Sequence, residues 1–154
     1  LSITRDNFLE NQIYSVVFFA MLIPISALLA DRYGRKLILM VASALIAIFG
    51  LYLAPLLGAS DSASILITLS IGMALMGFTY GPLGTILSEL FPTNVRYTGA
   101  SLSFNLAGIV GASLAPFIAL WLSANFGLEY VGYYLSIAAI ISLVAMSLSS
   151  KAGS

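Results

Sequence analysis

The chain has 154 residues, of which 60% are hydrophobic and 8% are charged, and its formal net charge is zero. Soluble domains carry about 25% charged residues, so this composition excludes an ordinary soluble fold. The sequence contains no cysteine and no histidine, which excludes a disulfide framework and a zinc site of the usual kind. We therefore expect no metal, no cofactor and no enzyme activity, and the neutral charge balance gives no indication of nucleic acid.

Uncharged apolar runs of about 18 residues or more are typical of transmembrane helices, and this sequence contains five of them. They predict an all-α membrane protein in contact with a lipid bilayer. The first residue is Leu rather than Met, and no signal peptide precedes the first run, so we expect a segment of a longer chain. The expected spans are about 12–30, 37–57, 63–87, 98–122 and 131–149.

Basic residues gather on one side of these spans. Five of the six Lys and Arg residues follow the first, third or fifth span, whereas the loops on the other side hold only Arg5. Loops rich in Lys and Arg stay in the cytoplasm. Loops 31–36 and 89–96 are therefore expected to be cytoplasmic, and the N-terminal end to start outside. The basic residues on the cytoplasmic side are Arg32, Arg35, Lys36, Arg96 and Lys151.

The first two spans have few polar features. Pro24 lies inside the first span, where it removes a backbone hydrogen bond and should kink the helix. The second span is almost wholly aliphatic, with no charge in its interior. We expect it to be a supporting helix that faces lipid.

The third span is rich in glycine. Gly77 and Gly81 have the four-residue spacing that lets two membrane helices approach closely. The run Gly81, Pro82 and Gly84 should break or bend the helix, as in helices that line the sites of transporters. Thr79 and Tyr80 are then the expected polar contacts with a cavity. The alternative is that these glycines serve close packing alone.

The fourth span is rich in small residues. The pairs Ala107 with Gly111 and Gly108 with Ala112 repeat the close-packing spacing. Asn105 is the most polar side chain in the span, and it should bind another helix or, alternatively, a substrate. The fifth span has few features beyond Gly132 and two adjacent tyrosines.

The segment 31–36 holds four of the twelve charged residues and forms a tight turn between two spans. Glu89 and Arg96 lie on the two sides of Pro92 at the other cytoplasmic loop, and can pair with each other or with charges of the segment 31–36. Exposed ion pairs contribute only about 0–1 kcal/mol each, but a network can bias two conformations that differ by a few kcal/mol. The alternative is that these charges only fix the orientation in the membrane.

These motifs resemble those of the major facilitator superfamily. The segment Asp31-Arg32-Tyr33-Gly34-Arg35-Lys36 is similar to its loop signature, Gly-x-x-x-Asp-Arg-x-Gly-Arg-Arg/Lys, with Ala27 in place of the first glycine. Glu89 and Arg96 have the Glu-x6-Arg spacing of the sugar-porter-like branch. The run from Glu89 to Ser101 resembles the metabolite:proton symporters at the end of the tenth helix and the start of the eleventh.

The resemblance implies that residues 1–154 form helices eight to twelve, a partial C-terminal six-helix half. About seven further spans, including the N-terminal half, should precede them. It implies secondary active transport of an organic acid or zwitterion, coupled to protons, by alternating access in a bacterial inner (plasma) membrane. No span here has an acidic or basic residue in its interior, so the proton carrier is expected outside this segment. The implied gating network comprises Asp31, Arg32, Gly34, Arg35, Lys36, Glu89 and Arg96.

Three alternatives remain open from the sequence. A sugar-porter-type carrier shares the loop signature and the Glu-x6-Arg pair, but lacks the longer run. A transporter-like receptor or sensor would carry a long soluble extension. A membrane enzyme would need nucleophiles, acids or metal ligands inside the spans, and none is visible.

Overall fold

The computed structural model describes residues 5–58 and 62–149, and every regular element in them is helical. Five helices are long and apolar enough to cross a membrane, which confirms the all-α membrane fold. Helices α4 and α5 and the π-helix η1 between them follow one another without a gap and form a single span. The elements are α1 (Arg5–Tyr33), α2 (Arg35–Gly58), α3 (Ser62–Glu89), α4 (Arg96–Gly108), η1 (Ile109–Leu114), α5 (Ala115–Asn125) and α6 (Leu128–Ser149).

The helices extend a few residues beyond the expected spans at most ends. Helix α1 already includes Arg5–Asn11, because polar residues continue the helical hydrogen-bond ladder after the apolar run has ended. The turn expected near residue 60 and the tail with Lys151 lie outside the described residues. The joint between α1 and α2 is the single residue Gly34.

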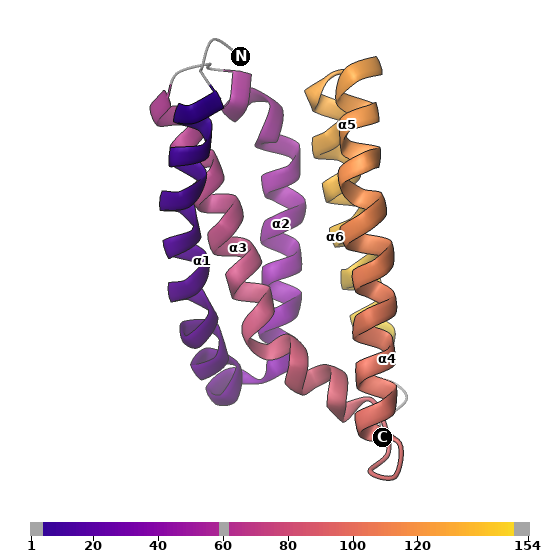
Figure 1. Cartoon of the computed structure of the whole chain (residues 1–154). Coiled ribbons are helices and arrows are strands. Elements are labelled where there is room, and N and C mark those ends of the chain that lie inside the picture. The colour runs from indigo at the N-terminus through magenta and orange to yellow at the C-terminus, as the bar shows by residue number, and fades with distance from the viewer. Residues whose placement is uncertain (1–4, 59–61, 150–154) are drawn as a thin grey trace.

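Both charged joints lie at one end of the bundle. Figure 1 shows the α1–α2 joint, the segment between α3 and α4, and the last turn of α6 at its lower end, whereas α1 begins at the upper end. Consecutive spans therefore run in alternating directions, as the charge pattern requires.

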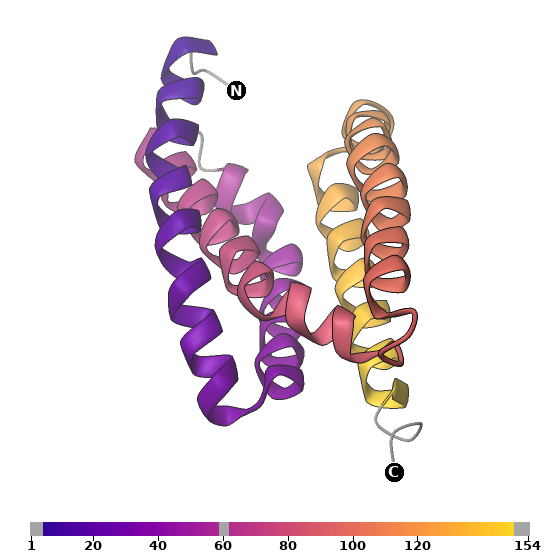
Figure 2. The same cartoon turned by 60° about the horizontal axis from the view of Figure 1, so that its bottom comes forward.

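The helices pack in pairs. Helix α1 lies along α3, and α2 lies along α6, with α2 also touching α1 and α3 (Figures 1 and 2). Helix α2, expected to be a supporting helix that faces lipid, contacts α1, α3 and α6 in the described bundle and still exposes a face that includes Leu37, Ile48 and Leu51. Its buried residues are Ile38, Leu39, Ala42, Ser43 and Gly50.

Two glycines bring α2 and α6 together. A Cβ atom on Gly50 would lie 2.7 Å from the carbonyl oxygen of Gly132, and one on Gly132 would collide with the carbonyl oxygen of Gly50. Beside this crossing, the buried hydroxyl of Ser136 donates a 2.7 Å hydrogen bond to the carbonyl oxygen of Ala47. Small residues permit such contact between helix backbones, and the hydrogen bond fixes its position.

Gly77 and Gly81 of α3 pack against α1. A Cβ atom on Gly77 would collide with the backbone of Phe19, and one on Gly81 would lie 2.6 Å from the carbonyl oxygen of Ile23 and 2.8 Å from the amide nitrogen of Ala27. The four-residue spacing thus serves close packing between the two helices.

The break or bend expected at Gly81, Pro82 and Gly84 does not interrupt the helix. Helix α3 continues through Pro82 to Glu89, and Gly77 and Gly81 hold it close to α1 on the N-terminal side of the proline. Membrane helices tolerate proline where neighbouring helices support them. The last turns of α3 leave α1 and run toward α4 (Figure 2).

Within the described residues, the fourth span makes no close helix contact at its small-residue pairs. Gly108 and Gly111 have open space where a Cβ atom would stand, and none of the most apolar window of this span is buried among the described residues. The span changes to a π-helix over Ile109–Leu114, directly before α5, whose second residue is Pro116. Proline lacks the amide N–H that a regular α-helix needs, so a wider turn occurs there.

Candidate functional site

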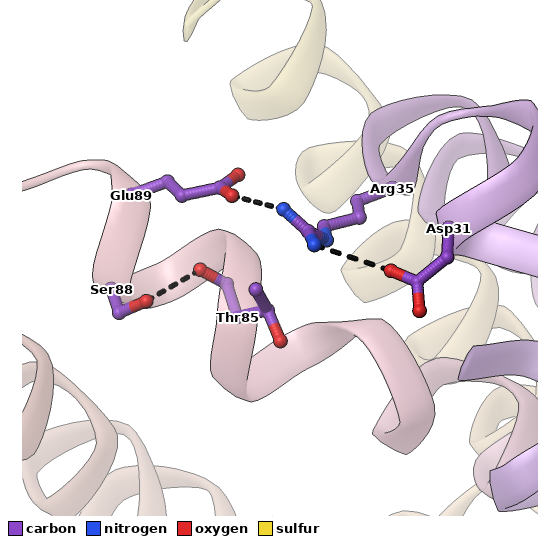
Figure 3. Close-up of polar contacts among 5 residues, drawn as sticks. All are labelled: Asp31, Arg35, Thr85, Ser88 and Glu89. Carbon is purple, nitrogen blue, oxygen red and sulfur yellow. Dashed lines mark hydrogen bonds and ion pairs between the residues drawn. The ribbon is translucent and has the colours of Figure 1, made fainter. Parts of the chain in front are cut away.

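The guanidinium of Arg35 joins two carboxylates from different helices (Figure 3). Its Nη1 donates to Oε1 of Glu89 at the end of α3. Its Nη2 donates to Oδ1 of Asp31 at the end of α1, at 3.2 Å. This charge cluster, comprising Asp31, Arg35 and Glu89, therefore connects the ends of three helices.

The local backbone explains how Asp31 and Arg35 meet across a helix boundary. Gly34 has a φ of +102°, in the left-handed region that glycine adopts without strain. Its amide donates to the carbonyl oxygen of Ala30 at 2.9 Å, and its own carbonyl accepts from the amide of Ile38 at 3.2 Å. The chain thus turns within one residue and keeps Asp31 and Arg35 side by side, which gives a physical reason for the glycine in the loop signature.

The charge cluster is accessible to water. The exposed fractions of the side chains are 35% for Arg35, 64% for Asp31 and 50% for Glu89. Exposed ion pairs contribute about 0–1 kcal/mol each, so this cluster adds little to stability. A contact that is cheap to break and spans three helix ends is suited to a conformational change rather than to holding the fold.

The other two basic residues of the first loop do not join the charge cluster. Arg32 lies over the ring of Tyr33, 5.6 Å from its centroid. Within the described part of the chain, neither Arg32 nor Lys36 has a carboxylate partner.

Arg96 also stands apart from the cluster, contrary to the expected pairing with Glu89 or Asp31. Its Nε donates to the carbonyl oxygen of Phe91 at 3.3 Å. The reason is the turn before α4, where the ring of Phe91 occupies the space that a Cβ atom of Gly99 would need, 2.7 Å from Cε1. This packing folds the turn back onto the first turn of α4 and places the carbonyl beside Arg96.

The candidate cavity residues are not gathered into one site. Thr79 donates to the carbonyl oxygen of Met76 on its own helix at 2.7 Å. Tyr80 packs edge to face on Phe19 of α1, with ring centroids 5.5 Å apart. Asn105 donates to the carbonyl oxygen of Ser101 at 2.8 Å, so it bonds within α4 and not across helices as expected. The reason is that the preceding turn of α4 offers a carbonyl acceptor to the amide of Asn105.

Among the described residues, a shallow recess lies at each end of the bundle. The larger one follows the α3–α4 segment, and its lining includes Arg96 and Tyr97. The smaller one lies between α2 and α6 and includes Glu129 and Tyr133. No group of acidic residues that could hold a metal occurs within residues 5–58 and 62–149.

The sequence interpretation missed the residues that set the helix crossings. Gly132 and Ser136 have the same small-residue spacing that was recognised at Gly77 and Gly81, and this signal could have identified the α2–α6 contact. Gly50 and Ala54 have this spacing as well, so the same signal was present on α2. Phe91 and Gly99 were part of the longer run, but only the fold brings them together.

The known proteins that are similar to this chain are membrane transporters. The sequence profile of the sugar (and other) transporter family matches residues 1–149. The inner membrane metabolite transport protein YhjE of Escherichia coli K12 is 44% identical over 152 residues, which cover 98% of this chain and 34% of the relative. The chain spans about a third of the length of this relative.

Two further relatives carry substrate names. The glycine betaine/proline/ectoine/pipecolic acid transporter OusA of Dickeya dadantii is 34% identical over 125 residues, covering 79% of this chain and 24% of the relative. The citrate-proton symporter of Klebsiella pneumoniae is 32% identical over 133 residues, covering 80% of this chain and 28% of the relative. No solved structure matches the chain significantly.

Proposed function

This chain belongs to the sugar (and other) transporter family of the major facilitator superfamily, and on that premise we propose that it forms helices eight to twelve of a secondary carrier. In this proposal the N-terminal half and the seventh helix come from the remainder of a longer protein. Carriers of this type move two six-helix halves around a site near the middle of the membrane. The single observation that carries the proposal is the family match over residues 1–149.

The substrate that we propose is a small polar metabolite, either an organic acid or a zwitterion. The relatives named for betaine, proline and citrate support this class, as does the run from Glu89 to Ser101. Sugars are the second candidate, because the family description names them first.

We assign the switching step to the charge cluster of Asp31, Arg35 and Glu89. In the proposed outward-facing state, Arg35 ties the end of α3 to the α1–α2 joint at the cytoplasmic side. In the inward-facing state, the end of α3 moves away and the pair with Glu89 opens. Breaking an exposed pair costs little, so a modest difference in substrate binding can shift the two populations.

Proton coupling, in this proposal, depends on residues outside this chain. No described span has an acidic or basic residue in its middle, and a carboxylate inside the membrane is the usual proton carrier. A substitution within 12–150 that abolished coupling but left the protein level and uncoupled transport intact would contradict this part.

Uptake by the full-length carrier in proteoliposomes tests the function. Radiolabelled citrate, glycine betaine, proline and glucose are compared at equal concentration, with and without an imposed proton gradient. The proposal expects uptake of an acid or a zwitterion that increases with the gradient. Uptake of glucose alone would favour the sugar carrier, and uptake of none of the four would count against the proposed substrate class.

A further inference from the structure

At the end of the bundle that carries the charged joints, cations outnumber carboxylates. Both carboxylates there, Asp31 and Glu89, bind Arg35. Among the described residues, the remaining cations at this end have no carboxylate partner. They are Arg32, Lys36 and Arg96. This end therefore has an unbalanced positive charge that favours an anionic partner.

One of these cations lies in a recess. Arg96 shares the larger recess with Ser88, Thr93, Tyr97, Ala100 and Ser101. The bond to Phe91 uses only its Nε, so the two terminal nitrogens of the guanidinium have no acceptor in the described part of the chain. Arginine binds phosphate with two parallel hydrogen bonds from this side of its planar group.

The position of the recess fits the boundary of a membrane. Arg96 is the first residue of the fourth span, and Tyr97 beside it is 88% exposed. Tyrosine is enriched at the depth of lipid head groups. Ala100 lies one turn further into the span, and most of the surface of the recess is apolar although Arg96 and Thr93 are among its lining residues.

We propose that this recess binds the phosphate group of an anionic phospholipid. The terminal nitrogens of Arg96 donate to the phosphate oxygens, the Thr93 hydroxyl contributes a further hydrogen bond, and an acyl chain runs along Tyr97 and Ala100. This inference goes beyond transport, since it concerns a lipid that stays bound to the carrier and is not moved by it. The lipid would occupy Arg96 at the joint between α3 and α4, at the same end of the bundle as the charge cluster.

Native mass spectrometry of the full-length carrier tests the proposal. Delipidated protein is titrated with phosphatidylglycerol, and the affinity of the tightest lipid site is measured. Arg96→Gln should weaken this site about tenfold, the scale expected for the loss of a charge-assisted hydrogen bond. Lys36→Gln is the matched control, because it removes one positive charge from the same end but not from the recess, and should change the affinity about twofold at most, through general attraction alone.

A second variant keeps the test independent of the charge. Ala100→Phe fills the apolar part of the recess and retains Arg96, so it should also weaken the tightest site, and it decides the matter if Arg96→Gln does not fold. Equal losses in Arg96→Gln and Lys36→Gln would overturn the proposal, as would unchanged affinity in Ala100→Phe. Displacement of the lipid by the same concentration of inorganic phosphate would show that a free anion, not a lipid, is the ligand.

Discussion

The Arg35 guanidinium donates to the Glu89 carboxylate across 54 residues of sequence, and so joins the first residue of α2 to the last residue of α3. The same guanidinium also binds Asp31. A single cation therefore connects three helix ends at the side where the chain passes from α3 to α4. The consequence is that any movement of the end of α3 away from α1 and α2 must break one identified contact.

Arg35→Gln and Glu89→Gln should be strongly non-additive. Each single variant removes the same ion pair, so the double variant should change the transport rate no more than the larger single effect. A bias of about 1 kcal/mol corresponds to a roughly fivefold change in the conformational equilibrium. Initial uptake rates in proteoliposomes of the native carrier, the two single variants and the double variant measure this non-additivity. Glu129→Gln, at the other end of the bundle, is the control, and fully additive effects of Arg35 and Glu89 would contradict the pairing.

Gly50→Ala should destabilise the protein by about 1–3 kcal/mol, the usual cost of overpacking. The added methyl group would meet the carbonyl oxygen of Gly132 and the side chain of Ser136, which are fixed parts of the α2–α6 crossing. The midpoint of thermal unfolding in detergent reports the change. Gly108→Ala is the matched control, because its methyl group would meet open space. A midpoint that falls equally in both variants would argue against this crossing.

Gly34→Ala should lower the free energy of unfolding by about 1–2 kcal/mol. The reason here is the left-handed backbone that this residue adopts. The position is open to solvent, so steric crowding plays no part. Gly84→Ala is the comparison, since Gly84 is equally open but helical, and alanine is tolerated there. Thermal unfolding of the two variants separates conformation from packing, and equal stability of both would mean that Gly34 does not need its positive φ.

Ser136→Ala should destabilise the protein by roughly 0.6 kcal/mol, the average for a hydrogen bond between membrane helices. Ser142 lies on the same helix, but its hydroxyl bonds to Ala138 of that helix at 3.0 Å. Ser142→Ala should therefore have the smaller effect. Denaturant titration of both variants gives the comparison, and a larger loss at Ser142 would show that the contact with Ala47 contributes little.

The number of spans and the fold class could be predicted from the sequence, because membrane helices need long uncharged runs and charges can only lie at their ends. The turn at Gly34 also followed from the clustering of charges in 31–36. The packing partners could not be predicted equally well. Nearly all faces of α2 are apolar, so its composition does not say which face meets protein and which meets lipid, and its central position depends on Gly50 and Gly132.

The candidate site was predictable in its composition but not in its pairing. Asp31, Arg35 and Glu89 were expected at one end, and the fold brings them into contact. Arg96 was expected among them, but a backbone carbonyl at Phe91 is closer than any carboxylate. Sequence spacing specifies which charges share a side of the membrane, whereas the turn geometry decides which of them meet. The π-helix before Pro116 likewise had no signal beyond the proline itself.

The fraction of carriers in the inward-facing state reports directly on the role of the charge cluster in switching. One spin label on Asn94, between α3 and α4, and another in the N-terminal half of the full-length carrier give a distance distribution for each variant in proteoliposomes. The account predicts that Asp31→Asn and Glu89→Gln each increase the inward-facing fraction several-fold over the native carrier and over Glu129→Gln. Unchanged distance distributions and unchanged uptake in both variants, at equal protein levels, would contradict the assignment of Asp31, Arg35 and Glu89 to the switching step.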